Sequence, residues 1–224
     1  MIQVWSPRPE QMQGPLGEAA ARCLATAFSS REWAATPMPL GDASDPHSAR
    51  GILAQLGKQA QVLIANVIGD DHGRTVLGCV LGAVLDRTLV DAYGLASYGA
   101  QGGDALLAYI GLMPAAQGHR ASLLSNNIFK LSSRQASSPS PHEGQSLAAL
   151  LFEKWLELSA IECCPRVFVR TRKVLAPIIH LAETNGFRYR GEFELDFHGE
   201  RQDRIVFARD NFSISRLVGR ESMA

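Results

Sequence analysis

The feature that most constrains the fold is residues 144–187, where a helix, a strand and a second helix follow one another. The first helix is expected over residues 145–160, because its leucines and Trp155 recur at helical spacing. A short apolar strand is expected over residues 166–169. A second helix is expected over residues 174–184, which a glycine follows. This order predicts a sheet that is covered by helices.

The rest of the chain supplies the other elements. Apolar periodicity predicts two more helices, over residues 16–28 and 47–59. Apolar runs bounded by turn residues predict the strands, which are expected at Ile2–Trp5 (an edge strand) and at residues 61–68, 75–85, 105–113, 187–197 and 204–208. The sum is an α/β (α+β) fold with a mixed, mostly antiparallel central sheet and helices on both faces.

Residues 121–141 depart from this pattern, because they contain seven serines and two prolines. Leu123, Leu124 and Ile128 in the first part predict a short helix, whereas the second part has the composition of a linker. We therefore expect one domain over residues 1–212 that carries this Ser/Pro-rich insertion. Residues 213–224 are expected to form a C-terminal tail.

Charge and cysteine content exclude several classes of protein. The 22 basic and 22 acidic residues give a formal net charge of zero, whereas nucleic-acid and membrane surfaces are usually bound by basic proteins. The four cysteines lack metal-ligand spacing, so we expect no metal. No apolar run is long enough to span a membrane. These observations predict a cytoplasmic protein that has no nucleic-acid or membrane partner.

Two segments rich in small residues could bind an anion. Gly118 lies in the first, residues 117–122, and Gly144 in the second, residues 143–148. A helix N-terminus presents unpaired N–H groups and a partial positive charge, and small residues let a pyrophosphate approach the backbone. The alternative is an ordinary helix start with no ligand.

With Asn185-Gly186-Phe187, these segments resemble the coenzyme A half of a Gcn5-related N-acetyltransferase. That family has a loop of the pattern Gln/Arg-x-x-Gly-x-Gly/Ala. In residues 117–122, Arg120 stands in place of its first glycine. In residues 143–148, Ser146 replaces one glycine and Glu143 replaces the amide or basic residue.

Spacing favours the second segment as the start of the loop helix. Gly144 lies one helix and a turn before Arg166, as the resemblance requires, whereas Gly118 lies too far away. We therefore expect Gly144 to begin the helix and residues 114–120 to form the first half of a split phosphate loop. Arg172 lies in a basic cluster with Arg170 and Lys173, which either meets coenzyme phosphates or forms a solvated turn.

The resemblance also implies where coenzyme A binds. Backbone N–H groups on the strand over residues 105–113 would hold the pantetheine arm as an added strand does, and Gly111 would suit a bulge. The expected coenzyme-binding residues are Ile110, Leu112, Met113, Gln117, Gly118, His119, Arg120, Gly144, Gln145, Ser146, Leu147, Ala148 and Arg172.

The catalytic candidates are Tyr109, Glu32 and Asp104, each of which could also be a solvated residue. A primary amine needs a general base because it is mostly protonated at neutral pH. The family tyrosine that protonates the leaving thiolate corresponds to Ala182, and the family asparagine corresponds to Leu175. The fold is therefore better supported than the mechanism.

The resemblance implies an acyl-CoA-dependent N-acyltransferase that transfers acetyl from acetyl-CoA to a primary amine of a small molecule by direct attack. The alternative is a catalytically weak or inactive module that binds coenzyme A or a partner in a regulatory role. A dinucleotide-binding fold is excluded because no Gly-x-Gly-x-x-Gly follows a strand.

The acceptor is expected to bind the least patterned segments, residues 29–46, 86–103 and 198–204. Four aspartates in or near them would favour a cationic acceptor: Asp42, Asp45, Asp91 and Asp196. The sequence is compatible with a homodimer and leaves the oligomeric state open.

Overall fold

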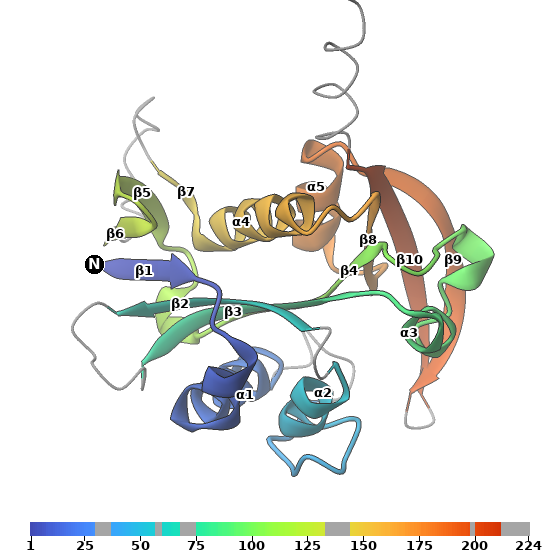
Figure 1. Cartoon of the computed structure of the whole chain (residues 1–224), viewed down its shortest axis with the longest axis horizontal. Coiled ribbons are helices and arrows are strands. Elements are labelled where there is room, and N and C mark those ends of the chain that lie inside the picture. Colours follow the sequence, from blue (N-terminus) through green and yellow to red (C-terminus); the bar gives the residue numbers. More distant parts are fainter. Residues whose placement is uncertain (30–36, 57–59, 68–74, 133–143, 198–199, 212–224) are drawn as a thin grey trace, which may run out of the picture. The chain divides into compact units, whose positions relative to one another are not determined.

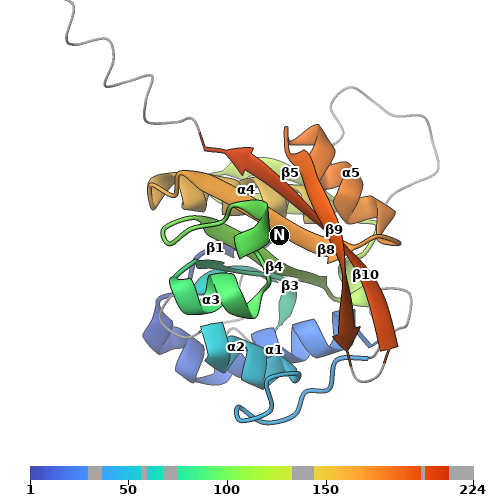
Figure 2. The same cartoon turned by 90° about the vertical axis from the view of Figure 1, so that its right-hand side faces the viewer.

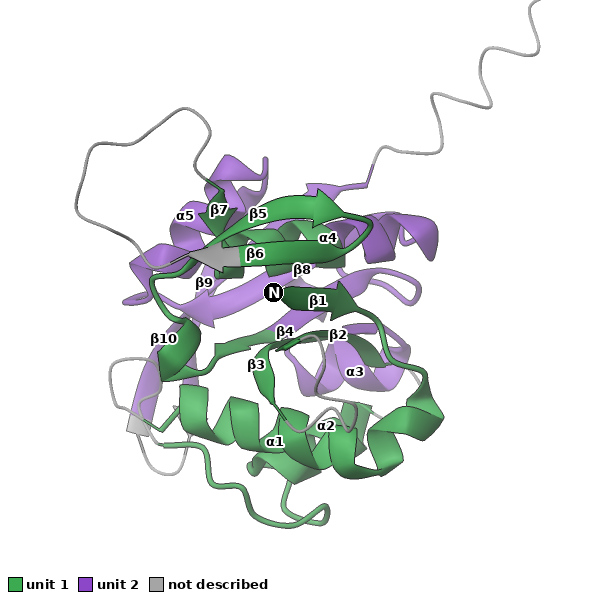
Figure 3. Cartoon of the chain, turned by 90° about the vertical axis from the view of Figure 1, so that its left-hand side faces the viewer, with its two compact units in different colours: residues 1–81, 109–155 green, residues 82–108, 156–224 purple. Residues whose placement is uncertain are grey.

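The computed structural model describes residues 1–29, 37–56, 60–67, 75–132, 144–197 and 200–211. The chain divides into two compact units. Unit 1 contains Met1–Leu81 and Tyr109–Trp155, and unit 2 contains Gly82–Ala108 and Leu156–Ala224 (Figure 3). Strands β3 (Val76–Val84) and β4 (Ala105–Leu112) and helix α4 (Leu147–Ile161) each run from one unit into the other.

Unit 1 is a largely antiparallel sheet with helices on both faces. Its strands follow the order β7-β5-β6-β1-β2-β3. The remaining bounds are β1 Ile2–Trp5, β2 Ala60–Val67, β5 Arg120–Ser125, β6 Ile128–Ser132, β7 Gln145–Ser146, α1 Pro15–Ala27 and α2 Ala49–Leu56, with short 3₁₀ turns η1 (Pro9–Gln13) and η4 (Pro114–Ala116). Helices α1 and α2 lie on one face of β2 and β3, and α4 begins on the other (Figure 1).

Two glycines show how closely the helices of unit 1 approach the sheet. A Cβ on Gly111 of β4 would lie 3.1 Å from Leu24 and 3.2 Å from Ala27, both on α1. A Cβ on Gly78 of β3 would lie 2.8 Å from Leu151 of α4. A larger residue at either position would therefore force the facing side chains of the helix to shift. The close approach of α1 accounts for a glycine at position 111, so the expected β-bulge is not needed to explain it.

Unit 2 contains the strand order β4-β8-β10-β9. Its remaining bounds are α3 Arg87–Ala92, η3 Ala96–Tyr98, β8 Arg166–Arg172, α5 Ala176–Thr184, β9 Arg188–Phe197 and β10 Glu200–Asp210. The β4–β8 pair is parallel, from Ala105 opposite Val167 to Leu107 opposite Val169. The pairs β8–β10 and β9–β10 are antiparallel. Strands β8 and β10 run between α3 and α5 (Figures 1 and 2).

The insertion differs from the sequence-based prediction. Its first part forms strands β5 and β6 rather than a helix. The two strands are joined at Asn126 and Asn127, and Asn127 has a φ of 56°. Asparagine tolerates this left-handed conformation, so the pair makes a tight hairpin turn. Residues 133–143, the linker-like part, lie outside the described residues.

The hairpin also corrects the position of the first strand. Strand β1 was expected at an edge, but Ile2 pairs with Val67 of β2 on one side and Phe129 of β6 on the other. Strand β1 is therefore not an edge strand, because β6 pairs with it on the side opposite β2. The other expected elements are confirmed with small shifts of their ends, and the loose segment 86–103 contains the short helix α3.

Candidate functional site

In unit 1, the two halves of the expected phosphate loop come together. The first residue of α4, Leu147, donates its N–H to the carbonyl of His119 at 3.4 Å. Arg120 pairs with Ser146 in the β5–β7 register, and its guanidinium donates to the carbonyl of Gly144 at 3.1 Å. The hairpin therefore leaves the loop at Arg120 and returns to it at Gly144.

The start of helix α4 differs from the expectation. The helix begins at Leu147, not Gly144, and Ser146 caps it by accepting a hydrogen bond from the N–H of Ala149 at 3.2 Å. A Cβ on Gly144 would lie 2.1 Å from the carbonyl oxygen of Ala121. Gly144 is therefore required by the close approach of strand β5, which the sequence pattern alone did not indicate.

The first half of the loop contains groups that could bind a ligand. Gly118 has a φ of 74°, and no atom lies within 4 Å of the position a Cβ would take. Nδ1 of His119 is buried and has no hydrogen-bond partner in the described part of the chain. A buried polar atom without a partner is costly, so the loop fits an added polar group such as a phosphate.

Strand β4 presents backbone groups of alternate residues to its two edges. Met113 donates its N–H to the carbonyl of Leu77 on β3 at 2.9 Å, so this N–H is already used within the sheet. By alternation, the N–H groups of Ile110 and Leu112 point to the opposite edge. The carbonyl of Leu112 accepts from Nε2 of Gln117 at 3.3 Å, which ties that edge to the loop.

The pairing of β4 along this opposite edge stops before the strand ends. In unit 2, the register with β8 ends at Leu107, opposite Val169, although β4 continues to Leu112. The part of β4 that follows lies in unit 1 and contains Ile110 and Leu112. An extended ligand could pair with these N–H groups as an added strand.

Tyr109 lies on the part of β4 that faces helix α1. Its ring packs edge-on against Phe28, with centroids 5.8 Å apart and an interplanar angle of 81°. The residue is half-buried. Tyr109 is therefore the catalytic candidate that lies on β4 itself.

Asp104 in unit 2 is held in a buried ion pair. Its side chain is 1% exposed, and its two oxygens accept from Nε and Nη2 of Arg166 at 3.2 and 2.8 Å. The N–H of Gln101 also donates to it at 2.8 Å. The bidentate pair joins the beginnings of β4 and β8. This geometry supports a structural role for Asp104 instead of the expected general base.

The basic cluster at the end of β8 is divided among several partners. Arg170 donates to the carbonyl of Tyr93 at 2.9 Å, and Lys173 pairs with Glu192 at 2.8 Å. Nη1 of Arg172, in contrast, is buried and has no hydrogen-bond partner among the described residues. Arg172 is therefore the member of this cluster that could bind an anion.

The remaining expectations fall in α5 and in a segment outside the described residues. Ala182, at the position of the family tyrosine, is fully buried. Asn185 ends α5, Gly186 has a φ of 78°, and the N–H of Phe187 donates to the carbonyl of Ala182 at 3.0 Å. The predicted helix stop is thus confirmed. Glu32 lies outside the described residues.

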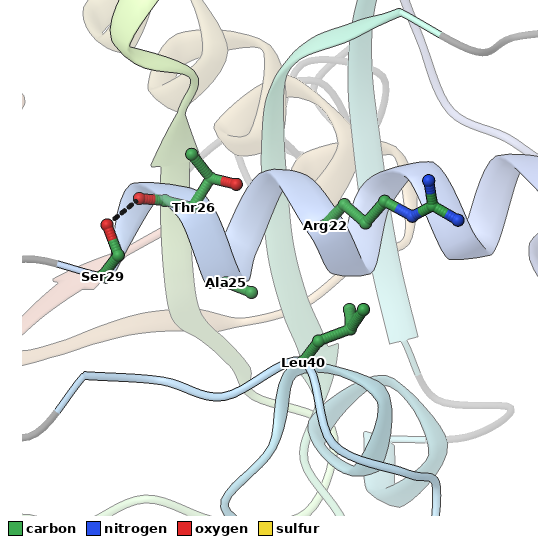
Figure 4. Close-up of a pocket in the computed structure, with 5 residues that line it drawn as sticks. All are labelled: Arg22, Ala25, Thr26, Ser29 and Leu40. Atoms are coloured by element: carbon green, nitrogen blue, oxygen red, sulfur yellow. Dashed lines mark hydrogen bonds between the residues drawn. The ribbon is translucent and has the colours of Figure 1, made fainter.

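An open groove of about 350 Å³ lies along α1 in unit 1. Arg22, Ala25, Thr26, Ser29 and Leu40 line it (Figure 4). Residues 29–46 were expected near the acceptor, whereas the contribution of α1 was not expected. The signal was present in the sequence, because Arg22, Ala25, Thr26 and Ser29 share the helix face opposite the buried Leu24 and Ala27.

Metal-binding clusters and membrane-spanning helices are absent from the described residues. No group of three or more His, Cys, Asp or Glu side chains could hold a metal ion there. No helix in that part of the chain is long and apolar enough to cross a membrane.

Comparison with known proteins identifies the fold. No family model and no curated protein matches the sequence. Solved structures do match. The ribosomal-protein-S18-alanine N-acetyltransferase of Escherichia coli is 15% identical, with 94% of each chain covered and a TM-score of 0.56. A GNAT-family acetyltransferase of Streptococcus pneumoniae is 13% identical, with 94% of this chain and 99% of that chain covered and a TM-score of 0.56.

A third structure includes a ligand. The yncA protein of Salmonella typhimurium, solved with its cofactor acetyl-CoA, is 13% identical, with 94% of each chain covered and a TM-score of 0.52. These similarities agree with the mixed, mostly antiparallel sheet and its covering helices. The chain therefore has the fold of the Gcn5-related N-acetyltransferases.

Proposed function

We propose that the protein is an acyl-CoA-dependent N-acyltransferase that transfers an acetyl group from acetyl-CoA to a primary amine of a small molecule. The observation that carries this proposal is the meeting of the two half-loops at the start of α4, where Leu147 donates to His119. This contact assembles a complete loop from segments that the hairpin separates in the sequence.

The proposed coenzyme contacts follow from groups that the fold does not use itself. The loop around Gly118 and His119 would take the phosphates, because it has an open backbone and a buried ring nitrogen without a partner. The N–H groups of Ile110 and Leu112 would pair with the pantetheine arm and polarise the thioester carbonyl. Met113 is not among these proposed contacts, because its N–H already donates to the carbonyl of Leu77.

The proposed reaction is a direct attack without an acyl-enzyme. The amine nitrogen forms a bond to the thioester carbon while the carbon–sulfur bond breaks. The amine loses a proton, and the departing thiolate gains one. An amine with a pKa of about 10 costs roughly 4 kcal/mol to deprotonate at neutral pH, so positioning and proton removal both matter. Tyr109 and Glu32 remain the proposed groups for proton transfer.

A second candidate function is a module that binds the coenzyme without efficient transfer. The fully buried Ala182 favours it, because α5 offers no hydroxyl at the position where the family tyrosine protonates the thiolate. Water could protonate the thiolate instead, since a thiol has a pKa of about 8.5. The two candidates therefore differ in rate and not in coenzyme binding.

One pair of measurements tests the proposal and separates it from the second candidate. Acetyl-CoA is titrated by calorimetry, and thiol release is then followed with a panel of primary amines. Binding with amine-dependent thiol release supports the enzyme. Binding without release across the panel favours the binding module. Absence of binding would contradict both candidates.

A further inference from the structure

The hairpin in unit 1 places two basic side chains and two hydroxyls on one face of the sheet. Arg120 of β5 is the register partner of Ser146 of β7, and Ser122 of β5 is the register partner of Lys130 of β6 (Figure 3). Side chains of register partners, and of residues two apart on a strand, leave the same face. We call Arg120, Ser122, Lys130 and Ser146 the hairpin cluster.

The burial of neighbouring residues agrees with this assignment. Ala121 and Phe129, which alternate with members of the hairpin cluster, are each 3% exposed. Lys130 is exposed, and Arg120 and Ser122 are half-buried. The buried residues therefore belong to one face of the hairpin, and the hairpin cluster belongs to the other.

The hairpin cluster borders the rejoined phosphate loop. Nη1 of Arg120 donates to the carbonyl of Gly144 at 3.1 Å. A Cβ on Gly144 would lie 2.5 Å from Oγ of Ser122, so this hydroxyl points toward the returning chain. Ser146 caps helix α4 by accepting from the N–H of Ala149. The hairpin cluster thus begins where the proposed phosphate loop ends.

The charge of the hairpin cluster is positive. Residues 105–142 contain no Asp or Glu, and Lys130 forms no ion pair with another described residue. The exposed Glu153 of α4 accepts from Nε2 of Gln145, which belongs to the opposite face as the partner of a buried alanine. Glu143 lies outside the described residues. Two cations on this face are therefore available to an anionic ligand.

We propose that the hairpin cluster binds the 3′-phosphate of coenzyme A, so that the protein prefers coenzyme A to its 3′-dephospho form. This inference rests on the proposed acyltransferase function. Coenzyme A carries this phosphate on the ribose that follows its pyrophosphate, and the loop proposed for the pyrophosphate runs directly into Arg120. Guanidinium, ammonium and hydroxyl groups all donate to phosphate oxygens, and the two cations balance the charge of a phosphate monoester.

Lys130 is the member of the hairpin cluster that should determine this preference. Arg120 already donates to the backbone of the loop, so its substitution would also disturb the pyrophosphate site. Lys130 is exposed on β6, and its ammonium acts as a point charge on a flexible stem. The insertion would then extend the coenzyme site by one phosphate contact, in addition to dividing the loop.

The test compares acetyl-CoA with 3′-dephospho-acetyl-CoA, which differ only in this phosphate. Both ligands are titrated by calorimetry into wild type, Lys130→Gln and Lys130→Arg, at low salt and at physiological ionic strength. Arg188→Gln is the control, because it removes an exposed positive charge from β9 in unit 2.

We expect the wild type to bind acetyl-CoA about 5- to 20-fold more tightly than the dephospho form. Lys130→Gln should lose most of this preference without a change in affinity for the dephospho form. Lys130→Arg should keep most of the preference, and Arg188→Gln should keep all of it. Added salt should reduce the preference in the wild type, because the contact is exposed.

Equal affinity of the wild type for the two ligands would overturn the inference and leave the proposed acyltransferase function intact. A Lys130→Gln variant with the full preference for acetyl-CoA would also overturn it. Failure of both ligands to bind the wild type would instead contradict the proposed function, and this inference with it.

Discussion

At the scale of single residues, the structure distinguishes a candidate catalytic residue, Tyr109, from a residue with a structural role, Asp104. Tyr109 lies on strand β4 and Asp104 immediately precedes it, and the sequence gives no reason to rank one above the other. The structure encloses Asp104 in an ion pair with Arg166, whereas Tyr109 remains half-buried against Phe28. Which polar residue meets which partner depends on contacts that are distant in the sequence, so it could not be predicted from the pattern alone.

A structural role for Asp104 predicts a loss of stability without a change in proton transfer. Asp104→Asn should lower the free energy of unfolding by about 3 kcal/mol, because Arg166 would lose its buried partner. Urea unfolding measures this loss. Arg201→Gln is the control, since its 3.7 Å contact with Glu194 is exposed and should cost less than about 1 kcal/mol. A reshaped pH–rate profile in Asp104→Asn would show that the carboxylate acts as the base.

Gly144 gives a second prediction at this scale. Gly144→Ala should destabilise the protein by about 1–3 kcal/mol, because the new Cβ would lie 2.1 Å from the carbonyl oxygen of Ala121. The matched control is Gly102→Ala, whose Cβ would have its nearest neighbour at 3.8 Å. Thermal unfolding compares the two. If Gly144→Ala is as stable as Gly102→Ala, strand β5 does not need this glycine.

At the scale of elements, helices and sheet strands with strong periodicity were predictable. The helix that became α4, the strand β8 and the stop at Gly186 all follow from local patterns. The hairpin β5–β6 was not predictable, because Leu123, Leu124 and Ile128 fit a helical spacing as well as a strand. The left-handed turn at Asn127 and the pairing of β6 with β1 favour strands over a helix here. The pairing with β1 is a long-range contact, which a local sequence pattern does not reveal.

An ion-pair network joins α1 to α2 and makes a prediction about pH. Hydrogen bonds from Arg50 and Arg22 lower the pKa of Glu18 to about 2. Because the folded pKa is depressed, the stabilisation is present above the ordinary pKa of about 4.3 and disappears as the pH falls toward 2. Glu18→Gln should therefore be less stable than wild type at pH 7 and equally stable near pH 2.

The network prediction is checked by urea unfolding at several pH values. Glu10→Gln is the control, because Glu10 is an exposed carboxylate of the neighbouring η1 turn. Its difference from wild type should stay small across the same range. A Glu18→Gln difference that does not shrink below pH 4 would show that the ion pairs do not stabilise the α1–α2 connection.

At the scale of the whole molecule, the fold was predictable because many weak signals agree. The order of helices and strands, the loop segments and Asn185-Gly186-Phe187 all indicated one family fold, and solved structures covering 94% of the chain have it. The acceptor was not predictable. The groove along α1 has a periodic signal on one face of the helix, but its lining by Leu40 depends on a contact between segments that are separate in the sequence.

The central claim is that the rejoined loop and the free edge of β4 bind acetyl-CoA. Hydrogen exchange with and without saturating acetyl-CoA tests it most directly. We predict that acetyl-CoA slows exchange of the N–H groups of Ile110 and Leu112 and of residues 117–119, while the N–H of Met113, already bonded to Leu77, changes little. Unchanged exchange across these residues at saturating acetyl-CoA would contradict the account.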